Sequence, residues 1–335
     1  MRSATCRLDR RLRRSESSNS QNPKTLKRAR RNRRCWITDS KPTKQDWLAI
    51  LCAITAVAIW GWWMSATRLA AQQGIAPLDV AFMRYSVPAL LLLPVWLSTL
   101  RKLKHAPRWS IIAMLGWGAP FLWLVTASLK ESDVVYFATI VPCTMPIFAV
   151  IAERVFFKQQ PTRTQIIGFV LIGTAALLVT ARAVSGGGTS LSSLGLMFLA
   201  AGGWACYVVS FRHTGLTAAQ GAAWVSVAST VVIVLVKLVT GSALLPLTTD
   251  QIVFNAISQG LISGFAAVLL YTIAIGRLGP VRSASFSVLL PILGSFFAWA
   301  WLKEVPTYFS LFSLVLGTIG VGVINGVFKS RARSN

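Results

Sequence analysis

The chain has 335 residues, of which 54% are hydrophobic and only 13% are charged, and its formal net charge is +24. A soluble domain carries about a quarter charged residues, so this composition excludes an ordinary soluble protein and predicts a membrane protein. The five cysteines lack CxxC or Cys/His spacing, which argues against a zinc site and a disulfide framework. We therefore expect no metal and no cofactor.

Residues 1–45 form a basic segment with a local net charge of +12. Its arginine runs lack apolar periodicity, so we expect a disordered cytoplasmic tail, or upstream sequence included by a wrong start site. The positive charge could bind anionic lipid head groups. An organelle transit segment is another interpretation, and nucleic-acid binding through phosphates is one that we do not favour.

Apolar stretches of about 20 residues follow one another from Trp47 onward, each long enough to cross a bilayer. Backbone groups in lipid must be satisfied internally, which favours helices for stretches of this length. The sequence therefore predicts an all-α membrane protein with ten transmembrane helices, near residues 47–67, 79–99, 110–129, 134–152, 164–181, 194–211, 220–240, 251–275, 282–302 and 307–328.

The short connections carry an uneven distribution of positive charge. Thirteen Lys and Arg residues fall on the side shared with the basic tail, and five fall on the opposite side. Because cytoplasmic loops hold the excess of Lys and Arg, both termini are expected to be cytoplasmic. The sequence thus predicts a multi-pass protein of the inner (plasma) membrane, ending in a basic tail at 329–335.

Three segments of the first half recur in the second half at a shift of 144 or 145 residues. They are WGWWMSATR from Trp60 and WACYVVSFR from Trp204, the proline pairs 146/161 and 291/306, and LIGT from Leu171 and VLGT from Val315. One shared shift indicates a duplication into repeats at 47–181 and 194–328, joined by a Gly/Ser linker at 182–193. Five spans is an odd number, so the second repeat enters the membrane in the opposite direction. Inverted repeats of this kind recur in secondary transporters that work by alternating access.

Several residues, in order and spacing, give the chain a resemblance to the EamA-like family of the drug/metabolite transporter superfamily over residues 47–328. They are Trp60-Gly61, Arg84, Pro146, Trp204-Ala205-x-Tyr207, Tyr271, Leu278-Gly279-Pro280, Pro291 and Leu302-Lys303-Glu304. The resemblance implies ten helices in two homologous halves and export or exchange of amino acids or amphipathic aromatic compounds. It also implies a central cavity lined mainly by the third, fourth, eighth and ninth helices, with help from the first and sixth.

One corner of the chain departs from the family pattern. The first half of such proteins usually carries Gly-Glu-Arg after the fourth span, whereas this chain has Lys158-Gln159-Gln160. The corresponding position of the second half keeps its acid, Glu304. A function that needs a carboxylate at both related corners is therefore in doubt, although a structural loop contact would survive the change.

Arg84 is the only ionisable residue well inside a predicted span. Charge in hydrocarbon costs about 2.5 to 3.5 kcal/mol on insertion scales, so such a residue is a functional candidate. Arg84 either pairs with Asp79 or snorkels toward the interface, or it acts in gating or contacts an anionic substrate. Lys237 lies near a span end and is expected to snorkel. No carboxylate sits in mid-span, so we predict facilitated or weakly coupled transport rather than proton coupling.

Two other groups of residues are candidates for the cavity wall. Prolines inside spans free carbonyl groups that membranes tolerate beside protein or water, and neighbouring polar side chains could bond there or simply join helices. Aromatic residues deeper than the interfacial belts either pack helices or stack on an aromatic or cationic solute. The predicted site residues are Trp60, Arg84, Trp117, Tyr136, Pro146, Trp204, Tyr207, Tyr271, Ser287 and Pro291.

The sequence shows no cluster of acids, histidines or a nucleophile with its base, so we do not expect an enzyme. A secondary transporter for a small-molecule solute is the favoured function. The alternative is a membrane scaffold or receptor-like protein that transports nothing. The sequence carries no indication of the oligomeric state.

Overall fold

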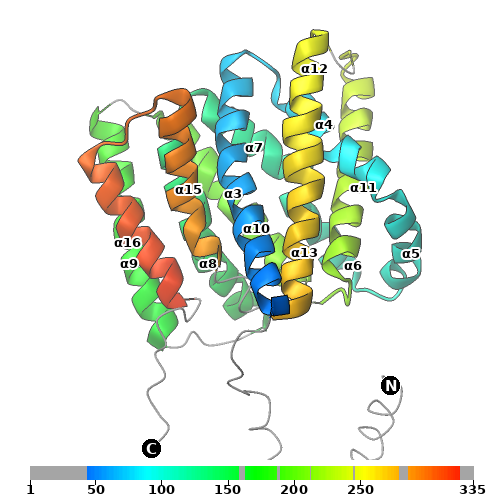
Figure 1. Ribbon diagram of the computed structural model, residues 1–335, viewed down its shortest axis with the longest axis horizontal. Helices are drawn as coiled ribbons and strands as arrows, with labels where there is room; N and C mark the ends of the chain where they lie inside the picture. Colours follow the sequence, from blue (N-terminus) through cyan, green and yellow to red (C-terminus); the bar gives the residue numbers. More distant parts are fainter. Residues whose placement is uncertain are drawn as a thin grey trace, which may run out of the picture. The chain divides into compact units, whose positions relative to one another are not determined.

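The structure of the chain is a computed structural model that describes residues 44–157, 163–186, 189–211, 213–243, 246–278 and 286–324. The predicted basic segments, apart from their edges at residues 44 and 45, lie outside these residues. Residues 45–335 form one unit, and the part of it that the structure describes is built from helices without a strand (Figure 1).

The described helices follow one another in chain order. The first half contains α3 (Lys44–Gln72), α4 (Pro77–Leu91), α5 (Leu93–Leu103), α6 (Arg108–Ala113), the short 3-10 helix η2 (Met114–Trp117), α7 (Ala119–Lys130), α8 (Val134–Phe157) and α9 (Arg163–Gly186). The second half contains α10 (Leu191–Phe211), α11 (Ala218–Val239), α12 (Thr249–Asn255), the π-helix η3 (Ala256–Ala266), α13 (Ala267–Leu278), η4 (Phe286–Leu289), α15 (Leu290–Phe297), the π-helix η5 (Ala298–Leu302) and α16 (Tyr308–Ile324). Since α9 continues to Gly186, the beginning of the predicted linker at 182–193 is helical.

Seven described helical segments are long and apolar enough to cross a membrane, and the pair α4 and α5 makes up to eight. The seven are Trp47–Gln72, Arg108–Lys130, Val134–Val155, Gln165–Arg182, Leu191–Phe211, Ala218–Val239 and Thr249–Ala274. The two remaining apolar helices, Leu290–Leu302 and Tyr308–Val323, are shorter in the described residues. The all-helical class is therefore confirmed, whereas the number of ten spans is not.

The second predicted span, 79–99, is wrong as a single straight helix. Its two parts, α4 and α5, meet at Leu92 and are bent by 86°. Pro88 lies inside α4 and Pro94 begins α5, and each proline removes one backbone donor and crowds the preceding turn. The chain therefore turns sharply where the apolar pattern alone runs on unbroken.

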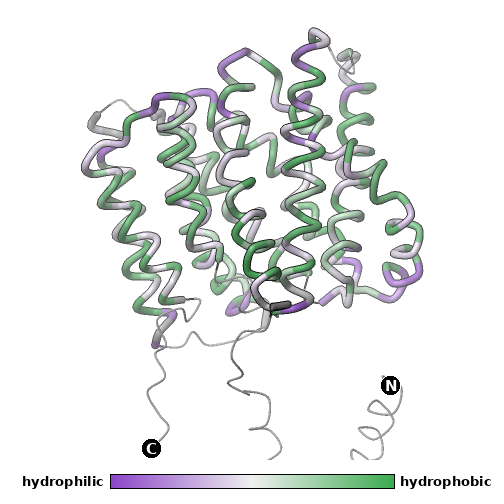
Figure 2. The backbone as a smooth tube through the Cα atoms, in the orientation of Figure 1, coloured by the Kyte–Doolittle hydropathy of each residue, from purple (hydrophilic) through white to green (hydrophobic). Residues whose placement is uncertain are grey.

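Buried side chains such as Val57, Leu122, Phe137 and Met197 form the core between the helices. Leucines and valines on the outer faces stay exposed, and Figure 2 shows hydrophobic colouring along most of the helices with hydrophilic colouring at their ends. This distribution fits helices that are surrounded by lipid. The helices nearest the functional site are α3, α4, α7, α10, α11 and η3.

Candidate functional site

Arg84 lies on α4 and is only 6% exposed. Its guanidinium donates to the backbone carbonyl of Gln259 (3.3 Å) and to the Ser263 hydroxyl, and it lies 4.5 Å from the ring centroid of Trp63. Gln259 and Ser263 both belong to the π-helix η3. The arginine is therefore held by a carbonyl, a hydroxyl and an aromatic face.

Small residues bring η3 close to α4. A Cβ atom on Gly260 would lie 2.7 Å from the Met83 carbonyl oxygen, and one on Gly264 would lie 2.9 Å from the Arg84 carbonyl oxygen. Close helix approach through small residues four apart is a common device in membrane helices. This close approach and the π-helical geometry of η3 together place Ser263 next to Arg84. π-Helical turns are often found at functional sites.

The predicted partner of Arg84 was wrong. Asp79 forms an ion pair with Lys237 (Oδ1 to Nζ 2.5 Å), and both side chains are buried. The predicted snorkelling of Lys237 is likewise wrong, because its ammonium turns inward to Asp79 and to the Ala243 carbonyl oxygen (2.8 Å). Within the described residues no carboxylate lies within ion-pair distance of Arg84. Arg84 is thus a buried cation without an acidic partner in that part of the chain.

A network of polar contacts extends from Arg84 to α3. The Trp63 indole donates to the Gln259 side-chain oxygen (2.6 Å), and the Trp60 indole donates to the Ser263 carbonyl oxygen (3.3 Å). The Trp60 ring also lies 5.1 Å from the ring of Tyr271. Two predicted site residues, Trp60 and Arg84, therefore meet at Ser263, and a third, Tyr271, packs against Trp60.

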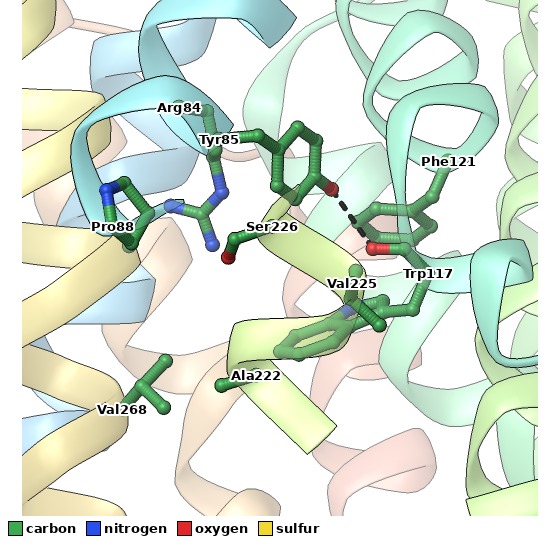
Figure 3. Close-up of a pocket in the computed structure, with 10 residues that line it drawn as sticks. Arg84, Tyr85, Pro88, Trp117, Phe121, Ala222, Val225, Ser226 and Val268 are labelled. Carbon is green, nitrogen blue, oxygen red and sulfur yellow. Dashed lines mark hydrogen bonds between the residues drawn. The ribbon is translucent and has the colours of Figure 1, made fainter. Parts of the chain in front are cut away.

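Aromatic side chains form a second group beside Arg84. Trp117 lies 4.9 Å from Tyr207 and 6.4 Å from Phe121, and Phe121 meets Trp204 edge-on at 6.3 Å, all between ring centroids. Tyr85 fixes this group through its hydroxyl, which donates to the Trp117 carbonyl oxygen (2.8 Å; Figure 3). The predicted residues Trp117, Trp204 and Tyr207 therefore lie together.

Arg84 lines one small cavity together with Trp117 and Phe121 of the aromatic group. In Figure 3 the guanidinium lies between Pro88 and Ser226, Phe121 stands on the far side of Tyr85, and the Trp117 ring lies below Tyr85. The cavity volume is about 20 Å³, which holds about one water molecule. This conformation is therefore closed around Arg84 to any molecule much larger than water.

The other predicted site residues lie elsewhere in the bundle. Tyr136 and Pro146 belong to α8, and Pro291 begins α15, which packs against α8. These three make no hydrogen bond or ring contact with Arg84. Ser287 lies in η4. The structure therefore divides the predicted residues between the Arg84 region and the α8–α15 region.

Sequence reasoning missed Tyr85, Phe121, Gln259 and Ser263, and it noted the depth of Trp63 without including this residue in the predicted site. Gln259 and Ser263 carry a usable signal, because two polar residues four apart in an apolar span lie on one helix face. The described residues contain no group of three or more His, Cys, Asp or Glu side chains that could hold a metal ion.

Comparisons with known proteins identify the family of the chain. The sequence model of the EamA-like transporter family matches the chain twice, at residues 47–181 and 191–326. A curated relative from Streptantibioticus cattleyicolor, named "Probable terminal-alkyne amino-acid exporter", is 28% identical over 228 residues, which are 66% of this chain and 70% of the relative. A solved crystal structure resembles the fold with a TM-score of 0.56 at 18% identity, covering 85% of this chain and 99% of the other. The chain belongs to the EamA-like transporter family of the drug/metabolite transporter superfamily.

Proposed function

We propose that this protein is a secondary transporter that exports or exchanges small metabolites with a carboxylate, such as amino acids or amphipathic aromatic acids. The observation that carries the proposal is the buried guanidinium of Arg84, which has no acidic partner among the described residues and faces a cavity. The family and the exporter relative support transport in general, and the charge of the site supports an acidic solute.

A buried cation without a counter-ion is a strong site for a carboxylate. Arginine presents a planar fork of donors that matches the two oxygens of a carboxylate, and the pairing is stronger away from water. In the closed conformation the Ser263 hydroxyl and the Gln259 carbonyl oxygen occupy some of these donors. A bound carboxylate would replace these neutral contacts with a charged one when the cavity opens.

The aromatic group supplies the other half of solute recognition. Trp117 and Phe121 line the same cavity as Arg84, and Tyr207 and Trp204 extend the apolar surface behind them. Aromatic surface favours the side chain of an aromatic or large apolar amino acid, through stacking and burial. The site thus suits a solute with an anionic end and an apolar end.

Movement of the solute would follow from two five-helix halves inserted in opposite directions, ten spans in all, with both termini on the cytoplasmic side of the inner membrane. Exchange between the two arrangements of such halves opens the midplane site to one side and then to the other. Arg84 has Ala228 at the related position of the second half, a shift of 144 residues. The solute carboxylate is therefore recognised by one half alone. We expect facilitated or weakly coupled transport, in keeping with the lack of a described carboxylate beside Arg84.

The test is solute flux in proteoliposomes that contain the full chain. Phenylalanine and phenethylamine share an aromatic ring and an amine, but only phenylalanine has a carboxylate. We expect the wild type to prefer phenylalanine, and Arg84→Gln to lower phenylalanine flux about tenfold or more while leaving phenethylamine flux little changed. Arg84→Lys should retain part of the preference. Lys130→Gln, which removes an exposed cation outside the site, is the matched control.

Two results would contradict the proposal. Unchanged phenylalanine flux in Arg84→Gln removes Arg84 from solute recognition. Absence of flux for amino acids, aromatic amines and organic anions in the wild type, combined with binding of a protein partner, favours the scaffold or receptor-like alternative instead.

A further inference from the structure

A second hollow lies away from Arg84, between the turn that follows α5 and the turn that joins α10 to α11. Its volume is about 460 Å³, and its lining includes Arg101, Lys102, His105, His213 and Thr214. This group of residues is called the basic pocket below. Its lining contains two cations, two imidazoles and no acid. It is far larger than the cavity beside Arg84 and shares no residue with it.

The cations of the basic pocket are not neutralised by the described part of the protein. Arg68 and Lys237 each contact a carboxylate, whereas no described carboxylate lies within ion-pair distance of Arg101 or Lys102. The Lys102 ammonium instead donates to the neutral side chain of Gln220 (3.0 Å). Gln220 itself belongs to the capping box that begins α11, so the lysine is held at the rim by a fixed acceptor. Among the described residues the pocket therefore presents positive charge without a carboxylate partner.

The helix that leads into the pocket has a lipid-facing side. Leu93, Leu97 and Arg101 are spaced four residues apart on α5, so they share one face, and both leucines are exposed. The rise from Leu97 to Arg101 is about 6 Å, roughly the step from acyl chains to head groups. Trp109, an exposed aromatic residue just beyond the turn, is typical of the membrane interface. Figure 2 shows the same change from hydrophobic to hydrophilic colouring where α5 ends.

We propose that the basic pocket binds the phosphate group of an anionic phospholipid such as phosphatidylglycerol, with Arg101 and Lys102 as the charged ligands. Basic pockets beside membrane helices bind lipid phosphates through the same chemistry. A free phosphate ester presents the same group to these donors. The exposed leucines immediately above the cations favour a lipid, because they give the acyl chains an apolar surface next to the bound head group.

A head group in this pocket contacts both halves of the chain. Arg101 and Lys102 lie in the last turn of α5 and His105 follows it, while His213 and Thr214 follow α10, the helix that carries Trp204 and Tyr207. The lipid would thus bridge the end of α5 and the end of α10, which carries two residues of the aromatic group. The fraction of anionic lipid in the membrane would then set how often the basic pocket is occupied, and so affect the transporter.

Native mass spectrometry of the purified full chain tests the proposal, with phosphatidylglycerol, phosphatidylcholine and inorganic phosphate as probes. We expect tight binding of phosphatidylglycerol to the wild type and about tenfold weaker binding to Arg101→Gln/Lys102→Gln. The matched control is Lys104→Gln/Arg108→Gln, which removes two exposed charges from the same turn without touching the pocket lining. It should change the affinity less than about twofold.

The outcomes separate the two sources of phosphate. Loss of phosphatidylglycerol binding in the pocket variant, with no competition by inorganic phosphate, supports the lipid. Competition by inorganic phosphate that depends on Arg101 and Lys102 overturns the choice of a lipid and assigns the pocket to a soluble phosphate ester. Equal binding to the two double variants, or equal affinity for phosphatidylcholine and phosphatidylglycerol, overturns the site altogether. These results leave the transport proposal untouched, since none of the substituted residues lines the Arg84 cavity.

Discussion

Arg68 and Glu304 form an ion pair of 3.2 Å (Nε to Oε1) that joins the end of α3 to the loop before α16. Both side chains are 12% exposed. The other oxygen of Glu304 accepts the backbone N–H of Val134 (2.8 Å), and Arg68 also contacts Asp133 (3.4 Å) and the carbonyl oxygen of Leu129. One arginine thus ties together three elements that are far apart in the sequence.

Replacing Arg68 with alanine should destabilise the protein more than replacing Glu304 with glutamine. Arg68→Ala leaves two carboxylates facing each other without a cation, whereas Glu304→Gln keeps an acceptor for the Val134 N–H. We expect Arg68→Ala to cost about 2 kcal/mol, less than the loss of a fully buried pair, because Asp133 is 45% exposed. Thermal unfolding in detergent measures both variants. A smaller loss for Arg68→Ala than for Glu304→Gln would show that the arginine does not organise this corner.

The carboxyl groups of Glu304 and Asp133 beside Arg68 should make the stability of the protein depend on pH. Burial raises the pKa of Glu304, against the lowering effects of the Val134 N–H and of Arg68, and burial also raises the pKa of Asp133. In the pH range between the ordinary and the raised pKa values of these carboxyl groups, the folded protein binds more protons than the unfolded chain. Stability should therefore fall as the pH rises through this range. Melting temperatures measured from roughly pH 4 to 7 check the slope, which Glu304→Gln should flatten. A slope of the opposite sign contradicts the raised pKa of Glu304.

The helices were predictable because long apolar stretches in lipid must form them, and most predicted ranges overlap the described helices closely. The bend at Leu92 was not predicted, since prolines occur both in straight and in broken membrane helices. The partner of Asp79 was missed for a different reason. Sequence spacing favours Arg84, five residues away, but Lys237 reaches the carboxylate from another helix. Contacts between helices are set by packing, which spacing along one helix does not contain.

In the candidate site, too, some residues could be predicted from the sequence and others depend on how the helices pack. Depth in the spans was enough to select Arg84, Trp117 and Tyr207, because charge and large aromatic side chains are unusual there. Gln259 and Ser263 were passed over because polar residues that join helices are common in membranes. Their importance lies in the π-helix and in the glycines that bring η3 against α4, and neither feature is visible before the helices are packed.

Gly203 and Gly202 give a sharp test of helix packing behind the aromatic group. A Cβ atom on Gly203 would lie 2.5 Å from the Gly116 carbonyl oxygen, whereas one on Gly202 would have no neighbour within 4 Å. Gly203→Ala should therefore destabilise the protein by about 1–3 kcal/mol through overpacking. Gly202→Ala should be neutral or stabilising, since alanine favours a helix over glycine. Melting temperatures of the two neighbours provide the measurement, and equal values would contradict the close approach of η2 and α10.

Tyr85 is expected to act through the position of Trp117 rather than through its own charge. Its hydroxyl donates to the carbonyl oxygens of Trp117 and Gly118, at 2.8 and 2.9 Å, where η2 meets α7. Tyr85→Phe removes these bonds without changing the ring, at a cost of about 1 kcal/mol in stability. We expect a higher KM for aromatic solutes, with transport of small amino acids less affected. Tyr308→Phe, at an exposed tyrosine on α16, serves as the control. Parallel losses for all solutes in Tyr85→Phe would indicate a general folding defect instead.

The buried ion pair between Asp79 and Lys237 should be costly to break and less costly to replace. Lys237→Met leaves the Asp79 carboxylate buried without its cation, and Asp79→Leu leaves the Lys237 ammonium without its anion. Each single change should destabilise the protein by about 3–5 kcal/mol, because a buried charge without a partner retains its full desolvation cost. The double variant Asp79→Leu/Lys237→Met should recover much of that loss, since an apolar pair between α4 and α11 needs no desolvation of charge. A double-mutant cycle on thermal stability measures the coupling, and additive losses would show that the two charges do not interact.

Phenylalanine flux of the double variant Asp79→Leu/Lys237→Met then distinguishes an effect on stability from an effect on transport. Flux near the wild-type value identifies the pair as a structural link between α4 and α11, whereas loss of flux in a stable double variant gives the charges a part in the transport cycle.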